Sequence, residues 1–189
     1  MPENKNVKIY IGFDQRESVA YHTFVQSLID HASIPLDITP LAVKTLKGYE
    51  EKHEDKSNDF VYSRFLTPFL NDFKGWAIFV DGDMICQTDI KELLDLRDNS
   101  KALQVVKHDY KTKANQKYLG NINQDYPRKN WSSVILWNCA HPKHKLLTPD
   151  FIANESGKYL HRFSWLEDSE IGGLPKEWNW LATEYPNND

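Results

Sequence analysis

The segment from Trp76 to Thr88, WAIFVDGDMICQT, constrains the fold of this chain more than any other. Its first five residues, 76–80, form an unbroken apolar run without helical spacing, bounded by Gly75 and Gly82. Such a run predicts a buried strand, most typically in a parallel sheet. The segment therefore favours an α/β protein with this strand at its centre.

Asp81, Gly82 and Asp83 follow this strand directly. In open α/β sheets, ligands bind beyond the carboxyl ends of the strands. Two carboxylates one residue apart repel each other, and a divalent cation with oxygen ligands, Mg²⁺ or Mn²⁺, removes that repulsion. The pattern predicts metal-bridged binding of a phosphorylated ligand. The alternative is a polar turn, since Asp-Gly pairs are common in turns.

The N-terminal region predicts a strand at residues 7–13, which ends at Asp14, and a helix at residues 16–31. A strand followed by a helix is how a nucleotide-binding βα unit opens, although no G-x-G-x-x-G fingerprint occurs here. Asp14 either contacts a base or ribose or caps the helix. The apolar face expected for this helix comprises Val19, Phe24, Val25, Leu28 and Ile29.

The rest of the chain alternates between predicted strands and helices. A helix at residues 60–73 carries Tyr62 and Arg64 near its start. Arg64 faces an anionic ligand, forms a structural salt bridge, or lies at the surface with only its charged end in water. Ser132 and Ser133 open a strand, where small residues allow a ligand close approach or tight packing. Further strands are expected at 36–43 and 102–107, an exposed loop at 44–59, and short helices at 88–96, 149–155 and 158–165.

Two histidines, His141 and His144, flank Pro142 and Lys143. The proline and the basic neighbours favour a surface turn over a metal site. Cys86 and Cys139 have no metal-binding spacing, and a reducing compartment is the default for such a pair.

Length and charge narrow the possible functions. The chain has 189 residues, enough for one domain, and its net charge of −4 argues against a nucleic-acid partner. Residues 1–8 hold no apolar signal segment and no run is long enough to span a membrane, so we expect a cytoplasmic protein without a transmembrane segment. Aromatic residues make up 13%, and such rings stack on sugars and bases as well as filling cores.

The ordered set of motifs resembles the family-8 glycosyltransferases with the GT-A fold. That set is the strand ending at Asp14, the segment Tyr62-Ser-Arg64, FVDGDMI, SSVILWN, an acidic segment and a late Trp-Asn pair, and it runs from Val7 to Trp180. The resemblance implies a single α/β domain over residues 1–189, with a mostly parallel central sheet flanked by helices. A nucleotide-binding part at about 7–107 would precede an acceptor part at about 108–189.

The resemblance also implies roles for individual residues. Asp81 and Asp83 would hold Mn²⁺, or Mg²⁺, against the diphosphate of a UDP-sugar, with Asp83 also near the sugar. Asp14 would contact the base or ribose, and Arg64 would bridge the nucleotide-sugar and the motif carboxylates. The remaining implied site residues are Tyr62 and Ser133 on the donor side and Asp168 as a nucleophile or a donor-orienting group. Independently of the resemblance, the polar and irregular segment 108–129 suggests that Tyr110, Tyr118 and Tyr126 line an acceptor surface.

The implied reaction displaces UDP from the anomeric carbon by a hydroxyl of a glycan, lipid or protein acceptor, with retention of configuration. The metal would offset the charge on the leaving diphosphate. The family's C-terminal His-x-x-Gly-x-x-Lys segment does not occur, and no histidine follows His161. We therefore expect water to complete the coordination sphere, the metal to be held weakly, and this chain to show low or no transfer activity.

Three other functions fit parts of the pattern. A haloacid-dehalogenase-type phosphatase also places Asp-x-Asp after an apolar strand, but here about 75 residues with a complete βα unit come first. Nucleotidyl transfer shares the metal and the fold class. A catalytically inactive protein that binds a sugar nucleotide or a glycan is the non-enzymatic alternative.

Overall fold

The computed structural model describes residues 6–109, 127–182 and 185. Tyr110, Tyr118 and Tyr126, which we expected along an acceptor surface, lie outside the described residues.

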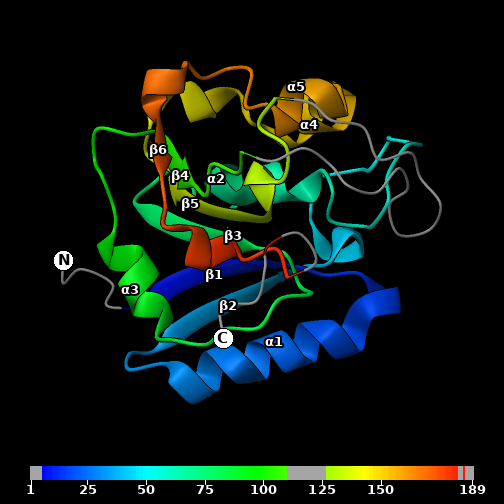
Figure 1. The fold of residues 1–189 in the computed structure, drawn as a ribbon. Coiled ribbons are helices and arrows are strands. Elements are labelled where there is room, and N and C mark those ends of the chain that lie inside the picture. The colour runs from blue at the N-terminus through cyan, green and yellow to red at the C-terminus, as the bar shows by residue number, and fades with distance from the viewer. Residues whose placement is uncertain (1–5, 110–126, 183–184, 186–189) are drawn as a thin grey trace.

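A mixed six-stranded sheet forms the centre of the described structure, with the strand order β2-β1-β3-β5-β4-β6 (Figure 1). Neighbouring strands pair in parallel except β5, which is antiparallel to both β3 and β4. The α/β fold and the mostly parallel sheet are confirmed, but the central strand β3 is parallel only to β1. In spatial order the strands are β2 (Leu36–Leu41), β1 (Val7–Gly12), β3 (Trp76–Val80), β5 (Val134–Asn138), β4 (Leu103–Val105) and β6 (Ile171–Gly173).

Helices cover both faces of this sheet. The long helix α1 packs below β1 and β2 in Figure 1, whereas α4 and α5 lie at the top of the view. Within the described residues, no helix combines the length and apolar character needed to cross a membrane. The helices are α1 (Ser18–His31), α2 (Thr67–Leu70), α3 (Ile90–Asp95), α4 (Pro149–Asn154) and α5 (Gly157–His161).

Two predicted helices differ from the structure. In place of one helix at 60–73 there is a 3₁₀ turn, Ser63–Leu66, followed by the four-residue α2. Pro68 has no backbone N–H, so it fits only the first turn of α2. On α1, Val19 and Ile29 were expected to be buried but are 79% and 56% exposed, because the helix turns Tyr21, Phe24 and Leu28 toward the sheet.

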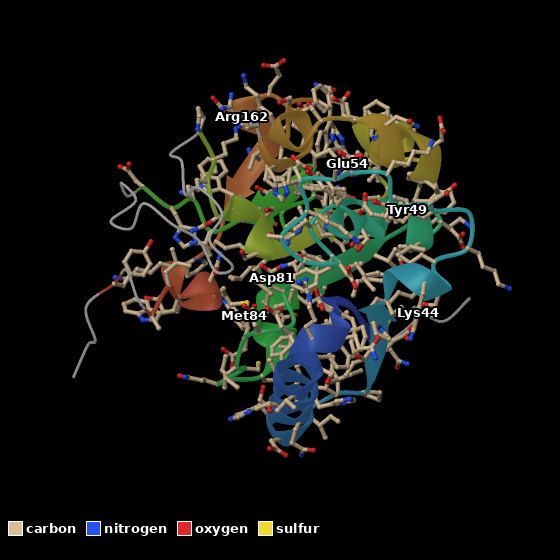
Figure 2. The ribbon with its side chains drawn as sticks, turned by 90° about the vertical axis from the view of Figure 1, so that its right-hand side faces the viewer. Lys44, Tyr49, Glu54, Asp81, Met84 and Arg162 are labelled. Atoms are coloured by element: carbon tan, nitrogen blue, oxygen red, sulfur yellow. The ribbon has the colours of Figure 1, made fainter. Side chains whose placement is uncertain are left out.

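The segment 44–59 is packed against the protein over part of its length, contrary to the exposed loop that we predicted. Tyr49 is buried and donates a hydrogen bond to Glu51 (2.9 Å), and the ring of His53 stacks on Tyr62 with centroids 3.5 Å apart. Lys44, Tyr49 and Glu54 mark the path of the segment in Figure 2. The Nε2 of His53 also lies 2.8 Å from the carbonyl oxygen of Glu155, so the segment lies beside the C-terminal part of the chain.

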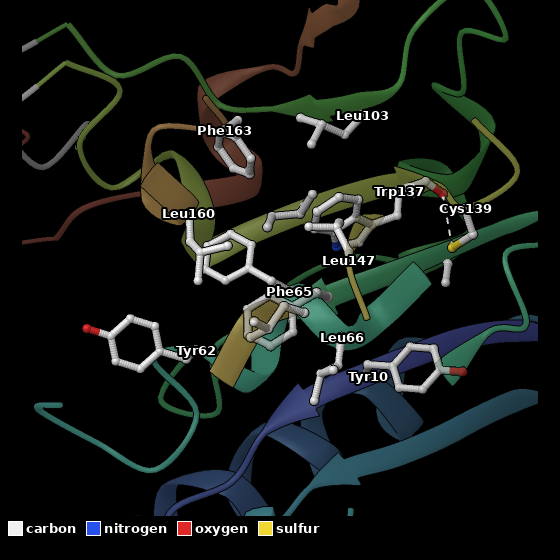
Figure 3. Packing of buried hydrophobic residues seen from close by; sticks show 14 of the residues in the cluster. Tyr10, Tyr62, Phe65, Leu66, Leu103, Trp137, Cys139, Leu147, Leu160 and Phe163 are labelled. Atoms are coloured by element: carbon white, nitrogen blue, oxygen red, sulfur yellow. Dashed lines mark hydrogen bonds between the residues drawn. The ribbon is translucent and has the colours of Figure 1, made fainter. Parts of the chain in front are cut away.

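Two apolar cores lie on opposite faces of the sheet, as the alternation of strand side chains requires. Ile78 of β3 packs with Phe24 and Leu28 of α1, whereas the next residue, Phe79, belongs to the other core. That second core, part of which is drawn in Figure 3, joins the sheet to α4, α5 and the 3₁₀ turn before α2. The sheet is therefore held between α1 and the C-terminal helices.

His144 is a polar residue that is buried beside the second core. The turn expected at His141–His144 is present as a 3₁₀ segment, Pro142–Leu146, but His144 is fully buried instead of lying on the surface. Its Nε2 lies 2.9 Å from the carbonyl oxygen of Ala102, and its Nδ1 accepts a hydrogen bond from Trp165 (3.3 Å). Burial lowers the pKa of His144 to about 4, so this side chain is a neutral core residue.

Two glycines let the strand ends that follow β1 and β3 approach each other closely. A Cβ atom on Gly82 would lie 2.2 Å from the carbonyl oxygen of Gly12, and one on Gly12 would lie 2.4 Å from the ring of Phe60. Gly82 is therefore needed for backbone packing between the two strand ends, which the turn alternative from the sequence did not anticipate.

We predict that Gly82→Ala destabilises the protein by about 3 kcal/mol or more, because a backbone oxygen cannot move aside as a flexible side chain can. Gly173→Ala is the matched control, since a Cβ there meets no atom within 4 Å. Chemical denaturation of both variants measures the difference. Equal free energies of unfolding for the two variants would contradict this account.

Candidate functional site

The ends of three strands meet at one edge of the sheet. β1 and β3 are parallel and both end there, while the antiparallel β5 begins there. The backbone N–H of Asp81 donates a hydrogen bond to the carbonyl of Ser133 (2.9 Å). The structure therefore brings the predicted residues Asp14, Asp81, Asp83 and Ser133 to the same edge, and Figure 2 looks onto the face with Asp81 near its centre.

Asp81 is a carboxylate in an unfavourable environment. Its side chain is only 16% exposed, and its Oδ1 is buried without a hydrogen-bond partner. Burial raises the pKa of Asp81 to about 7, and the charges of Asp83 and Glu17 act in the same direction, while Arg64 and Ser133 oppose them. A cation beside Oδ1 would satisfy this oxygen.

Arg64 lies directly behind Asp81. Arg64 Nη1 forms an ion pair with Asp81 Oδ1 at 2.9 Å. The hydrogen bond from Nη1 goes to the carbonyl of Ser132 (2.8 Å). The guanidinium also donates from Nε to the carbonyl of Val61 (3.1 Å) and lies over the ring of Phe79. Arg64 is thus a buried partner of the motif carboxylate and not a surface arginine.

Asp83 is exposed, and a further carboxylate, Glu17, lies within electrostatic reach of it. Burial raises the pKa of Glu17, and the charges of Asp83 and Asp14 raise it further. The sequence pattern does not single out Glu17, whose only signal is its place in the first turn after Asp14. The edge thus gathers negative charge that a divalent cation would neutralise.

The residues at this edge fit such a cation in part. Asp81 offers a buried oxygen without a hydrogen bond, and Asp83 offers an exposed carboxylate two residues later. Within the described ranges, no group of three or more His, Cys, Asp or Glu side chains is arranged to hold a metal. A cation here would therefore need oxygen ligands from water or from a bound phosphate as well.

Asp14 is almost fully buried and both of its oxygens are engaged. Oδ1 accepts a hydrogen bond from the backbone of Arg16 (2.9 Å), and Oδ2 accepts one from the backbone of Asp59 (3.1 Å). The hydrogen bond from the Arg16 side chain is the main reason why the pKa of Asp14 falls to about 2. The capping alternative is realised at the 3₁₀ turn Gln15–Glu17, and a contact with base or ribose stays a prediction.

Tyr62 and Asp168 are not brought to Asp81 by any described contact. Tyr62 is buried, and its hydroxyl donates to Asp55 (2.6 Å) beneath the segment 44–59. Asp168 precedes β6, at the edge of the sheet where β4 and β6 begin, which is opposite to the edge with Asp81. Its carboxylate is 88% exposed and pairs with Arg128 (2.5 Å).

The comparison with known sequences gives two results. The model of the family described as "Glycosyl transferase family 8" matches residues 3–141. A protein of Arabidopsis thaliana named Protein CDI is 47% identical over 183 residues, which is 95% of this chain and 71% of that protein.

Solved structures with a similar fold are glycosyltransferases. The bifunctional enzyme WbbM, 15% identical, superposes with a TM-score of 0.64 over 94% of this chain and 40% of its own. GlyE of Streptococcus pneumoniae TIGR4 gives 15% identity and a TM-score of 0.55 over 94% and 47% of the two chains. Mouse xyloside xylosyltransferase 1 is 13% identical and superposes with a TM-score of 0.53 over 92% of this chain and 86% of its own.

These structural matches establish the GT-A fold, and this chain spans less than half the length of WbbM and GlyE. The sequence matches establish the family, as the ordered motifs predicted. The chain belongs to glycosyl transferase family 8.

Proposed function

We propose that this protein is a metal-dependent glycosyltransferase that moves a hexosyl group from a UDP-sugar to an acceptor hydroxyl with retention of configuration. Family membership supports sugar transfer. The observation that supports metal dependence is the buried, unbonded Oδ1 of Asp81 next to the exposed Asp83 at a strand end.

Asp81 and Asp83 are the residues that would hold Mn²⁺ or Mg²⁺. When bound, this cation would act as a Lewis acid on the leaving diphosphate. Arg64 supplies a fixed positive charge behind Asp81, and its orientation is set before any ligand arrives by the carbonyls of Val61 and Ser132. Charges held in place in this way need no rearrangement during the reaction.

The remaining assignments are proposals taken from the family resemblance. Asp14, Tyr62 and Ser133 are proposed for the donor side and Asp168 for the sugar-transfer step, although the Tyr62 hydroxyl bonds to Asp55 and Asp168 lies at the opposite edge of the sheet. The acceptor is proposed to be a glycan, lipid or protein. Low activity of this chain and a cytoplasmic location stay predictions.

We predict that Asp81→Asn and Asp83→Asn each abolish Mn²⁺-dependent UDP binding, because each removes one of two ionic ligands. Calorimetry with UDP and Mn²⁺ measures the affinity, and chelation with EDTA should reproduce the loss in the parent protein. Asp95→Asn is the control, because this carboxylate lies exposed on α3.

The same variants separate the alternatives. Unchanged affinity in both would overturn the metal assignment. Release of UDP from UDP-sugars by the parent favours transfer, hydrolysis of a generic phosphomonoester favours a phosphatase, and nucleotide binding with neither activity favours an inactive binding protein.

A second prediction concerns stability without metal. The pKa of Asp81 is raised in the folded protein to about 7 from its ordinary value of 3.8, so ionising it disfavours folding. The unfolded chain binds fewer protons between these values, and the stability of the parent should fall as the pH rises from about 4 to about 7.

Asp81→Asn should remove this penalty, on the order of 4 kcal/mol above pH 7 and near zero below pH 4. Thermal unfolding of the parent and the variant in EDTA across this range tests the sign. A variant less stable than the parent at pH 7.5 would show that Asp81 is a net stabilising residue.

A third prediction is that Arg64→Lys weakens UDP-sugar binding by about tenfold or more, because charge-assisted hydrogen bonds contribute about 1.5–3 kcal/mol each. Lysine keeps the positive charge but cannot reach both the Val61 and Ser132 carbonyls with a planar fork. Arg97→Lys, at an exposed position, is the control. Parent-like binding by Arg64→Lys would make Arg64 a structural residue.

A further inference from the structure

A line of polar side chains runs from Asp81 through Arg64 into the C-terminal part of the protein. Arg64 Nη1 lies 2.8 Å from the carbonyl oxygen of Ser132 and 3.5 Å from its hydroxyl. The same hydroxyl lies 3.0 Å from Nδ1 of His161, at the end of α5. Arg64 and Ser132 are 5% and 6% exposed, so these contacts are largely shielded from water.

The chemistry of these groups determines which of them donates and which accepts each hydrogen bond. A guanidinium only donates hydrogen bonds, so the Ser132 hydroxyl accepts from Arg64. Its own hydrogen is then available for Nδ1 of His161, which accepts it when the ring proton resides on Nε2. His161 thereby fixes the rotation of the Ser132 side chain, and Ser132 presents both of its oxygens to Arg64.

The position of His161 is set by α5. Ser156 caps this helix through the backbone N–H of Tyr159, and a Cβ on Gly157 would lie 2.7 Å from the hydroxyl of Tyr62. Because of this close approach, α5 packs against the 3₁₀ turn that carries Arg64. The ring of His161 also packs edge-on against Phe65, with centroids 5.1 Å apart.

We propose that His161 is a positioning residue that acts through Ser132. It keeps Nη1 of Arg64 bonded to the Ser132 carbonyl and 2.9 Å from Asp81 Oδ1, and it thereby fixes the guanidinium charge beside the carboxylate that would hold a divalent cation. This inference rests on the proposed function, because it assigns His161 and Ser132 to the metal and nucleotide site of that reaction.

The experiment separates the polar contact of His161 from its packing. His161→Asn retains a polar atom near the position of Nδ1 but loses the ring, whereas His161→Phe retains a ring against Phe65 and loses the polar atom. Mn²⁺-dependent UDP affinity is measured by calorimetry for both, with Ser132→Ala and the double variant Ser132→Ala/His161→Phe.

We expect His161→Asn to bind within about twofold of the parent, and His161→Phe and Ser132→Ala to bind about tenfold more weakly, the effect of one lost hydrogen bond. The double variant should bind no more weakly than either single variant, because all three break the same line of contacts. Ser132→Ala, the smallest change, gives the answer if a His161 variant does not fold.

Two results would overturn the inference in distinguishable ways. Parent-like affinity in His161→Phe and Ser132→Ala would show that His161 serves packing alone, and the proposed function would stand. A parent protein that binds no UDP in the presence of Mn²⁺ would overturn the proposed function and, with it, the role of His161.

Discussion

The buried contact between Arg64 and Asp81 is the interaction on which the candidate site depends. Burying a carboxylate is costly, and an arginine at 2.9 Å without a hydrogen bond offsets that cost only in part. A protein selected for stability alone would complete this pair or replace it with apolar side chains. Here the guanidinium is bonded to backbone carbonyls instead, which leaves Oδ1 of the carboxylate without a hydrogen bond. Sites that serve a function commonly retain groups that lower the stability of the protein.

The topology of the sheet explains why these residues meet. β5 comes from the C-terminal half of the chain but lies between β3 and β4, and it runs against both. Its first residues therefore stand at the edge where β1 and β3 end. The predicted nucleotide-binding part, 7–107, and acceptor part, 108–189, consequently share one sheet, and a serine of the second part touches the arginine of the first.

Negative charge dominates this edge of the sheet. The charge of Asp83 raises the pKa of both Asp81 and Glu17, and the charge of Glu17 also raises the pKa of Asp81. Asp14 differs because Arg16 and the backbone satisfy both of its oxygens, which lowers its pKa to about 2. The unsatisfied charge is thus concentrated at Asp81 and Asp83, and a divalent cation with phosphate oxygens is the ligand type that would neutralise it.

The sequence alone determined the parts of this protein that depend on local patterns. The apolar run at 76–80 became β3 with the predicted bounds, the first strand formed within one residue of its predicted end, and the ordered motifs identified the family. The tertiary structure decided which distant segments became neighbours. β5 runs antiparallel to β3, and Tyr62 is buried in the interior. Asp168 lies at the edge of the sheet opposite to Asp81, and Ser132 contacts both Arg64 and His161. Strand and helix periodicities extend over a few residues, whereas strand order and the seating of α5 depend on packing summed over the whole core, which no local pattern records.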